Sequence, residues 1–196
     1  SYDKGRKNTK MGLSVGMVTT WKTRCGIATY SENLATALSK LGVDIYIVRL
    51  PRFGAKGPEM MRNIAEGAPV SKVDLLHVQH EYGLYQSLEG VFFDTLRALG
   101  KPIVTTMHSV GNWELDRIIT GRSDRIIVHN EFCFRRVSVP EKVGIIPHGA
   151  NPLMTPPPPR DACKKALGID PKTLLVGYMG FISSYKGLEI LIEAMK

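Results

Sequence analysis

Histidines at the ends of predicted strands are the residues of this sequence best suited to chemistry. The chain has 5 histidines, and each lies within or at the end of a short apolar run with the composition of a strand. Imidazoles bind and release protons near neutral pH. Ligands bind outside the carboxyl ends of strands in open α/β sheets, so the four histidines after the first favour a binding cleft. A hydrogen bond to a neighbouring backbone group explains any single one equally well. The histidines are His77, His80, His108, His129 and His148.

A glycine turn before the first predicted helix offers a second candidate site. Gly26 ends a polar loop where the backbone must turn, and the helix N-terminus that follows presents N–H groups and a positive dipole end to an anion. The dinucleotide fingerprint G-x-G-x-x-G is absent, and a single glycine turn is more often structural. Cys25, beside it, is placed to have a lowered pKa. No base partner is evident for Cys25, so a nucleophilic role is the minor interpretation.

Metal binding by the segment around His77 and His80 is not expected. These two residues are separated by Val78 and Gln79 on a predicted strand, where alternate side chains point to opposite faces. The helical zinc motif H-E-x-x-H is also absent. The sequence therefore predicts no metal site and no metal cofactor.

Lys186 is a candidate phosphate-binding residue near the end of the chain. It precedes Gly187 at the start of the last predicted helix, where a lysine is well placed to meet a phosphate group. Taken alone, the same lysine is better explained as an exposed surface residue.

The scaffold for these residues is predicted to be α/β. Leu13–Thr20 and Val43–Leu50 are apolar runs with the composition of buried strands, and between them apolar residues recur every three or four positions, as on an amphipathic helix that Gly42 ends. Further short apolar runs follow at 73–79, 102–107, 125–128 and 143–146. Such strands separated by helices indicate a Rossmann-like, doubly wound parallel sheet.

Composition shifts divide the chain into four predicted parts. Residues 1–10 form a basic, disordered tail, and 11–153 form the first domain. The proline-rich segment 154–160 is a stiff linker. Residues 161–196 then contain a helix, a buried strand at 173–179 and a second helix. We interpret that last part as the truncated start of a second α/β domain.

The net charge of +8 favours an anionic partner such as a phosphate group, an acidic membrane face or nucleic acid. Nucleic acid is set aside, because no helix-turn-helix, zinc finger or aromatic-basic repeat is present. Segment 51–70 carries Arg52, Lys56 and Arg62 near two methionines. This pattern fits peripheral contact with an anionic membrane surface, but it fits a mobile, solvated loop better.

A cytoplasmic protein is expected. No run approaches the ~18–20 apolar residues of a membrane span, and no signal sequence is evident. The 3 cysteines are too few and too scattered for a disulfide framework, which favours reduced thiols.

Taken in order, these segments resemble the retaining glycosyltransferases of family 4, the group-1 glycosyl transferases with the two-Rossmann-domain GT-B fold. The likeness covers nearly the whole chain from Met11. It is carried by Cys25-Gly26-Ile27-Ala28-Thr29-Tyr30, Gln79-His80-Glu81-Tyr82-Gly83, Pro102-Ile103-Val104-Thr105-Thr106-Met107-His108, Ile146-Pro147-His148-Gly149-Ala150, and Gly177-Tyr178-Met179-Gly180 through Lys186-Gly187.

The resemblance implies a reaction and three principal site residues. A sugar would pass from a nucleotide-diphosphate sugar to a glycan or lipid-linked acceptor, without a metal. Gly26 corresponds to the glycine loop near the donor phosphates and the acceptor. His108 corresponds to a catalytic histidine that contacts the transferred sugar. Lys186 corresponds to the lysine that neutralises the donor diphosphate.

The resemblance also implies acceptor-side or cleft residues. Cys25, His80 and Glu81 belong to this group without individual roles. His148 and Gly149 match the turn at the crossing between the acceptor-side domain and the donor-binding domain.

Two departures from the family pattern concern the donor site. The arginine often found a few residues before the lysine is missing from segment 181–185. The paired glutamates that bind the donor sugar and ribose in this family would lie beyond Lys196. The chain alone is therefore expected to be inactive.

Two other functions remain open. The chain can be a stand-alone binding module or the acceptor subunit of a split enzyme, which partner-dependent activity would reveal. It can also be a nucleotide-sugar epimerase, which would need catalytic carboxylates that we do not identify. The oligomeric state, the donor and the acceptor stay undetermined at this level.

Overall fold

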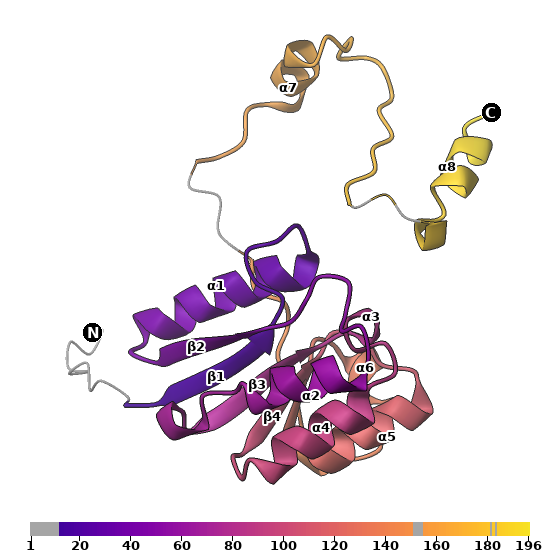
Figure 1. Cartoon of the computed structure of the whole chain (residues 1–196). Helices are drawn as coiled ribbons and strands as arrows, with labels where there is room; N and C mark the ends of the chain where they lie inside the picture. Colours follow the sequence, from indigo (N-terminus) through magenta and orange to yellow (C-terminus); the bar gives the residue numbers. More distant parts are fainter. Residues whose placement is uncertain (1–11, 151–154, 181, 183) are drawn as a thin grey trace. The chain divides into compact units, whose positions relative to one another are not determined.

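The protein divides into two compact units, Ser1–Gly149 and Ala150–Lys196. The computed structural model describes residues 12–150, 155–180, 182 and 184–196 (Figure 1). The predicted basic tail, residues 1–10, and part of the predicted linker lie outside the described residues.

A six-stranded, fully parallel sheet forms the centre of the first unit, as the sequence predicted. Its strands are β1 (Ser14–Thr19), β2 (Asp44–Arg49), β3 (Leu75–His80), β4 (Ile103–Met107), β5 (Arg125–Val128) and β6 (Val143–Ile145). Their order across the sheet is β2-β1-β3-β4-β5-β6. The chain thus moves outward from β1 to β2, returns past β1, and continues in the opposite direction.

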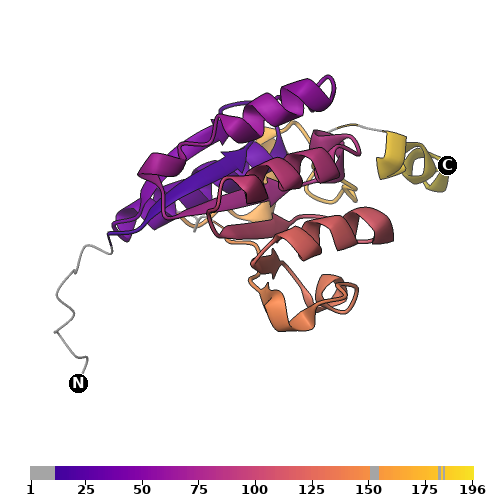
Figure 2. The same cartoon turned by 60° about the horizontal axis from the view of Figure 1, so that its bottom comes forward.

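Helices cover both faces of this sheet. Because parallel crossovers are right-handed, the reversal at β1 places the first helix on one face and the later helices on the other. Figure 1 shows α1 apart from the others, and Figure 2 shows α2, α4 and α5 in a row across one face. The longer helices are α1 (Gly26–Lys40), α2 (Pro58–Glu66), α4 (Glu89–Ala98) and α5 (Trp113–Arg122), and the short ones are α3 (Tyr82–Tyr85) and α6 (Glu131–Phe134).

The helix α1 ends as the sequence predicted, with Gly42 directly after its C-cap. The N–H of Gly42 donates to the carbonyl of Ser39 at 3.0 Å, and the N–H of Val43 donates to that of Leu38 at 3.2 Å. This paired arrangement is the Schellman motif, which needs a left-handed residue. Gly42 has a φ of +84°, so the position favours glycine. The motif turns the chain directly into β2.

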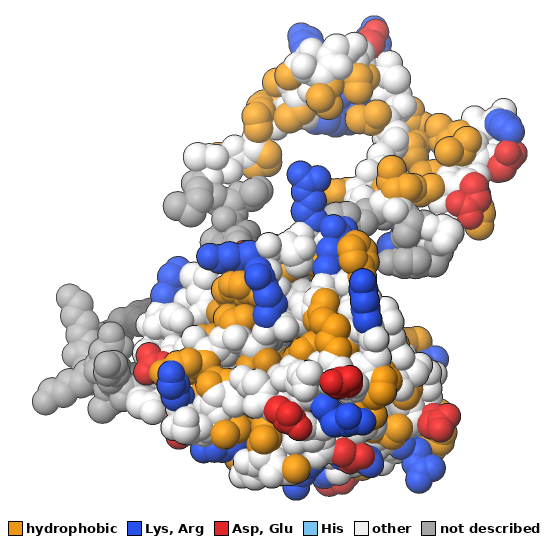
Figure 3. All heavy atoms as spheres, viewed as in Figure 1, with side chains coloured by type: hydrophobic (Ala, Val, Ile, Leu, Met, Phe, Trp, Pro, Cys, Tyr) orange, Lys and Arg blue, Asp and Glu red, His pale blue; other side chains and the backbone are white. Residues whose placement is uncertain are grey.

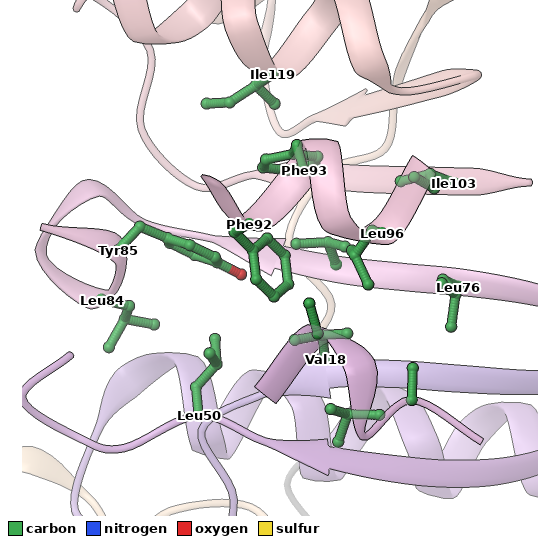
Figure 4. Packing of buried hydrophobic residues seen from close by; sticks show 14 of the residues in the cluster. Val18, Leu50, Leu76, Leu84, Tyr85, Phe92, Phe93, Leu96, Ile103 and Ile119 are labelled. Carbon is green, nitrogen blue, oxygen red and sulfur yellow. The ribbon is translucent and has the colours of Figure 1, made fainter. Parts of the chain in front are cut away.

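The hydrophobic core lies between the sheet and the row of α2, α4 and α5 (Figure 4). Phe92 and Phe93 of α4 are fully buried and meet edge to face, with ring centroids 5.4 Å apart. The ring of Tyr85 completes the cluster, with its centroid 5.1 Å from that of Phe92 and 6.4 Å from that of Phe93. Burial of one such ring stabilises the fold by roughly 1.5–3 kcal/mol.

Segment 51–70 is not a mobile loop, contrary to the interpretation that we favoured from its composition. Its centre is the helix α2, whose Pro58 occupies the first turn, where a missing N–H costs nothing. Met61 and Ala65 of this helix have no exposed surface and pack in the core. The exposed surface over α2 and α4 shows basic and acidic side chains interspersed (Figure 3).

The second unit contains the helices α7 (Arg160–Ala166) and α8 (Leu188–Ala194). The predicted strand at 173–179 was wrong, because no strand occurs among the described residues of this unit. A strand is stabilised by hydrogen bonds to a neighbouring strand. Leu174 is instead 87 % exposed and Met179 is fully exposed, so these apolar side chains are not buried against the described residues. None of the described helices is long and apolar enough to cross a membrane.

Truncation of Phe92 tests this core. We expect Phe92→Ala to lower the free energy of unfolding by about 3–5 kcal/mol, because a cavity replaces a fully buried ring. The matched control is Phe53→Ala, since Phe53 is 76 % exposed and its loss should change stability by less than about 0.5 kcal/mol. Urea denaturation of both variants measures the difference, and equal losses would contradict this description of the core.

Candidate functional site

The candidate site lies at the carboxyl edge of the sheet, where the strand order reverses. β1 is bonded to β2 on one side and to β3 on the other, although the chain reaches β3 only after β2. Such a switch point is where open α/β sheets bind ligands. Several residues near the carboxyl ends of β1, β3 and β4 are polar but fully buried. They include Thr19 of β1, Gln79 and His80 of β3, and Thr106 of β4.

Three of the histidines meet at this edge. His108 directly follows β4, His129 directly follows β5, and His148 lies shortly after β6. The centroids of the His108 and His129 rings are 5.0 Å apart, and those of His129 and His148 are 3.7 Å apart. We call these three residues the histidine cluster. Four histidines were expected at this edge, and the structure gathers these three.

Tyr30 of α1 lies against the whole histidine cluster. Its ring meets those of His108, His129 and His148 edge to face, with centroid separations of 4.7, 5.3 and 5.2 Å. Burial raises the pKa of the Tyr30 hydroxyl. The first turns of α1 therefore form one wall of the site.

A chain of close polar contacts leads from inside the sheet to the cluster. His77 Nε2 lies 2.8 Å from the hydroxyl of Thr106 and 3.2 Å from the amide nitrogen of Gln79. The amide oxygen of Gln79 lies 3.0 Å from His108 Nε2. His108 Nδ1 in turn lies 3.3 Å from His129 Nε2. The buried Gln79 amide thus connects a histidine of the sheet to the cluster at its edge.

The imidazoles at this edge include neutral ones. Burial, followed by the nearby His129 and His148, lowers the pKa of His108 to about 3. Burial also lowers the pKa of His148, with a smaller contribution from His129. At neutral pH these two rings can therefore donate and accept hydrogen bonds without carrying a positive charge.

His80 and its neighbour Glu81 have different surroundings from the cluster. His80 is fully buried, lies 3.2 Å from Glu89 of α4 and stacks on Tyr85 at 5.0 Å. His80 Nδ1 and the second oxygen of Glu89 have no hydrogen-bond partner among the described residues. Glu81 precedes α3 and accepts a hydrogen bond from the hydroxyl of Ser109. The side chain of His80 is therefore enclosed in the protein and does not line a cleft.

The N-terminus of α1 remains open in this structure. Within the described residues, the side chain of its N-cap Cys25 makes no capping bond and the first turn holds no acidic residue. Cys25 Sγ instead accepts a long bond, 3.6 Å, from the hydroxyl of Thr20. A Cβ added at Gly26 would meet no described atom within 4 Å. The protein's own packing does not require glycine here, which leaves room for a ligand over the helix end.

The loop before α1 is held in place by two hydrogen bonds. The guanidinium of Arg49 donates to the carbonyl of Trp21 at 2.7 Å, and the N–H of Lys22 donates to Glu32 at 2.9 Å. These bonds fix the path by which the chain enters the helix.

The remaining predicted site residues lie at or beyond the boundary between the units. Gly149 is exposed and is the last residue of the first unit. Lys186 lies in the second unit, at the end of a 3-10 turn, Ser184–Lys186. Gly187, which follows it as the N-cap of α8, has a φ of +66° and so favours glycine.

Two residues of the site, Tyr30 and Gln79, were not among those selected from the sequence. Tyr30 belongs to the apolar stripe of α1, and nothing in that pattern separates a core residue from a site residue. Gln79 is a polar residue near the end of a buried strand, which was a usable signal. His129 was expected at this edge with the other histidines, without an individual role, and it follows β5 as His108 follows β4.

No protein-family model and no curated protein matches the chain. Similar solved structures include MurG of Acinetobacter baumannii, with a TM-score of 0.46, 11 % identity, and 72 % of this chain and 47 % of that chain covered. They also include an alpha-glucosyltransferase in complex with UDP and DNA, with a TM-score of 0.41, 13 % identity, and coverages of 67 % and 39 %.

An enzyme of another class has a comparable likeness. The O-acetylhomoserine sulfhydrylase of Wolinella succinogenes matches with a TM-score of 0.38, 14 % identity, and 60 % of this chain and 30 % of that chain covered. The chain spans less than half the length of each of these structures. Likenesses of this degree assign no activity to it.

The burial of His77 predicts a pH dependence of stability. Burial lowers the pKa of His77 to about 4 in the folded protein, against an ordinary value of 6.5. The unfolded chain therefore binds the extra proton first, and stability that is complete above pH 6.5 is lost as the pH falls toward 4. The expected loss is about 3 kcal/mol.

Denaturant unfolding of the wild-type protein and of His77→Gln, at neutral pH and at mildly acidic pH, measures this contribution. The variant should show a smaller loss than the wild type, because glutamine carries no titrating group. Identical losses in the two proteins would contradict the neutral, buried state of His77.

Proposed function

We propose that this chain is the acceptor-side half of a retaining, nucleotide-sugar-dependent glycosyltransferase whose acceptor is a glycan or a lipid-linked glycan. The observation that carries the proposal is the meeting of His108 with the open N-terminal turns of α1 at the switch point of a parallel sheet. The order of motifs along the sequence supports the same function.

The chemistry of sugar transfer suits these groups. Breaking a sugar–phosphate bond builds negative charge on the leaving diphosphate and positive charge on the sugar ring. N–H groups at a helix N-terminus and a lysine stabilise the negative charge. In this proposal the N-terminus of α1 serves the diphosphate. Lys186 of the second unit keeps the phosphate-binding role that the family resemblance implies. A neutral His108 hydrogen-bonds the sugar without placing a second positive charge beside its ring.

The other site residues take supporting parts in this proposal. Cys25 and Glu81 line the acceptor side, and His80 supports the edge from within the core through its contact with Glu89. His148 and Gly149 lie at the crossing between the units. Peripheral contact with an anionic membrane through segment 51–70 stays a prediction.

The coding sequence beyond the codon for Lys196 is the first test. We expect it to encode a second α/β half with two glutamates seven residues apart, because the donor sugar and ribose need those carboxylates. A stop codon within a few residues would contradict a single-chain enzyme, and would favour the acceptor subunit of a split enzyme.

In the complete enzyme, His108→Ala should lower kcat/KM by about 10²–10³-fold, as expected when one stabilising contact to the reacting group is lost. Release of nucleoside diphosphate in the presence of acceptor measures the rate. The control is Leu41→Ala, at the opposite end of α1, where the side chain is 65 % exposed. A His108→Ala enzyme as fast as this control would overturn the assigned role.

The 196-residue chain by itself should be inactive, since the family resemblance places the donor-binding glutamates beyond Lys196. Nucleotide-diphosphate sugars incubated with the chain should release no more nucleoside diphosphate than with the His108→Ala chain. Turnover above that background would show that this chain holds a complete donor site, contrary to the proposal.

A further inference from the structure

Two hydrogen bonds fix which nitrogens of the cluster carry protons. His129 Nδ1 lies 2.9 Å from the carbonyl oxygen of Ile146, which can only accept. His129 Nδ1 must therefore carry the hydrogen. When the ring is neutral, Nε2 then carries a lone pair and can only accept.

The same reasoning applies to His108. Its Nε2 lies 3.0 Å from the amide oxygen of Gln79, which can only accept, so Nε2 carries the hydrogen and Nδ1 is the lone pair. In the structure the amide nitrogen of Gln79 lies 3.2 Å from His77 Nε2, and the amide oxygen is directed toward His108. The buried amide thus determines the state of His108.

The two lone pairs face each other. His108 Nδ1 and His129 Nε2 are 3.3 Å apart, and two acceptors at this distance repel unless a cation lies between them. Two nitrogens that bind one tetrahedral zinc ion, at about 2.0–2.1 Å each, stand about 3.3–3.4 Å from one another. The observed separation is thus that of two ligands of one ion.

His148 supplies a third nitrogen. One ligand atom from each of the three histidines lies within 4.8 Å of the others. A shared proton would join two nitrogens, whereas three convergent nitrogens form a metal-ligand set. His148 is exposed and lies outside helix and strand, so its ring can move inward to complete the set.

We propose that His108 Nδ1, His129 Nε2 and His148 bind one divalent transition-metal ion of the zinc type, with a fourth position left open. Imidazole nitrogens suit zinc, copper, nickel and iron, whereas magnesium and calcium need oxygen ligands. The outer bonds to Gln79 and Ile146 are those that commonly orient metal-binding histidines.

The surroundings select the fourth ligand. No carboxylate belongs to the ligand set within the described residues, so the bound ion keeps its full charge. The first turns of α1, with their positive dipole end, form the neighbouring wall through Tyr30. Both features favour an anionic fourth ligand, such as hydroxide or a phosphate oxygen.

The metal site can be tested without the proposed glycosyltransferase activity, although both involve His108. Nothing in its geometry requires a nucleotide sugar or residues from the second unit. The metal ion and a sugar hydroxyl would compete for the same atom, His108 Nδ1. No metal was expected from the sequence, where only His77 and His80 were considered as ligands. In the structure these two residues have separate partners.

Calorimetric titration of the metal-free 196-residue chain with zinc chloride tests the proposal. One ion should bind per chain. His148→Asn should weaken binding by more than about 100-fold, because a ligand is lost and not merely its support, and His129→Asn should do the same. Gln79→Leu should weaken binding by about 10–100-fold, as loss of an outer-shell partner does. Cys163→Ser, in the second unit, should bind as the wild type does.

His148→Asn is the decisive variant, because His148 is exposed and its replacement leaves the core intact. The absence of saturable binding would overturn the proposal, as would equal affinities of the wild-type and His148→Asn chains. Loss of binding in Cys163→Ser alone would place the ion elsewhere and overturn it too. No nucleotide sugar is present in this experiment, so its failure leaves the proposed glycosyltransferase function untouched.

Discussion

The pairing of β1 with β3 is the constraint on which the rest of the first unit depends. The chain can reach this pairing only by passing β2 and returning, and right-handed crossovers then force α1 to one face and the later helices to the other. The same reversal opens the carboxyl edge between α1 and the ends of β3 and β4. The reversal of the chain at β1 therefore determines both where the core forms and where the candidate site lies.

Buried polar groups at that edge need partners, and this requirement organises the site. Gln79 has no exposed surface, so both ends of its amide must be satisfied inside the protein. One end is used by His77 and the other by His108. Gln79 thereby links His77 within the sheet to His108 at its carboxyl edge. An apolar residue in place of Gln79 would leave His77 and His108 without this link.

The sequence was sufficient to predict the sheet, because its strands are short apolar runs separated by a clear helical period. The six strands and the end of α1 at Gly42 follow from local patterns that the fold does not override. Segment 173–179 has the same composition as those strands but no neighbouring strand to bond, and composition alone cannot report that. The helix α2 was missed for another reason. Its buried face is short, with only Met61 and Ala65, and the basic residues of the segment favoured a solvated loop.

The site was predictable only in part, for a related reason. The strand-end rule placed the histidines at one edge without separating His80, which turns toward Glu89, from the others. That separation depends on which face of β3 each side chain occupies and on what packs there. Tyr30 carries no sequence signal of a site at all, since its place beside the cluster results from the packing of α1 on the sheet.

His148 stands at the very end of the first unit, and the chain passes into the second unit immediately after Gly149. Any ligand that holds the ring of His148 against His108 and His129 therefore also orders the backbone of residues 147–149. By thermodynamic reciprocity, a change that displaces this short stretch of backbone weakens the hold on the ligand by the same free energy. Occupancy of the carboxyl edge and the conformation of the last residues of the first unit are in this way coupled.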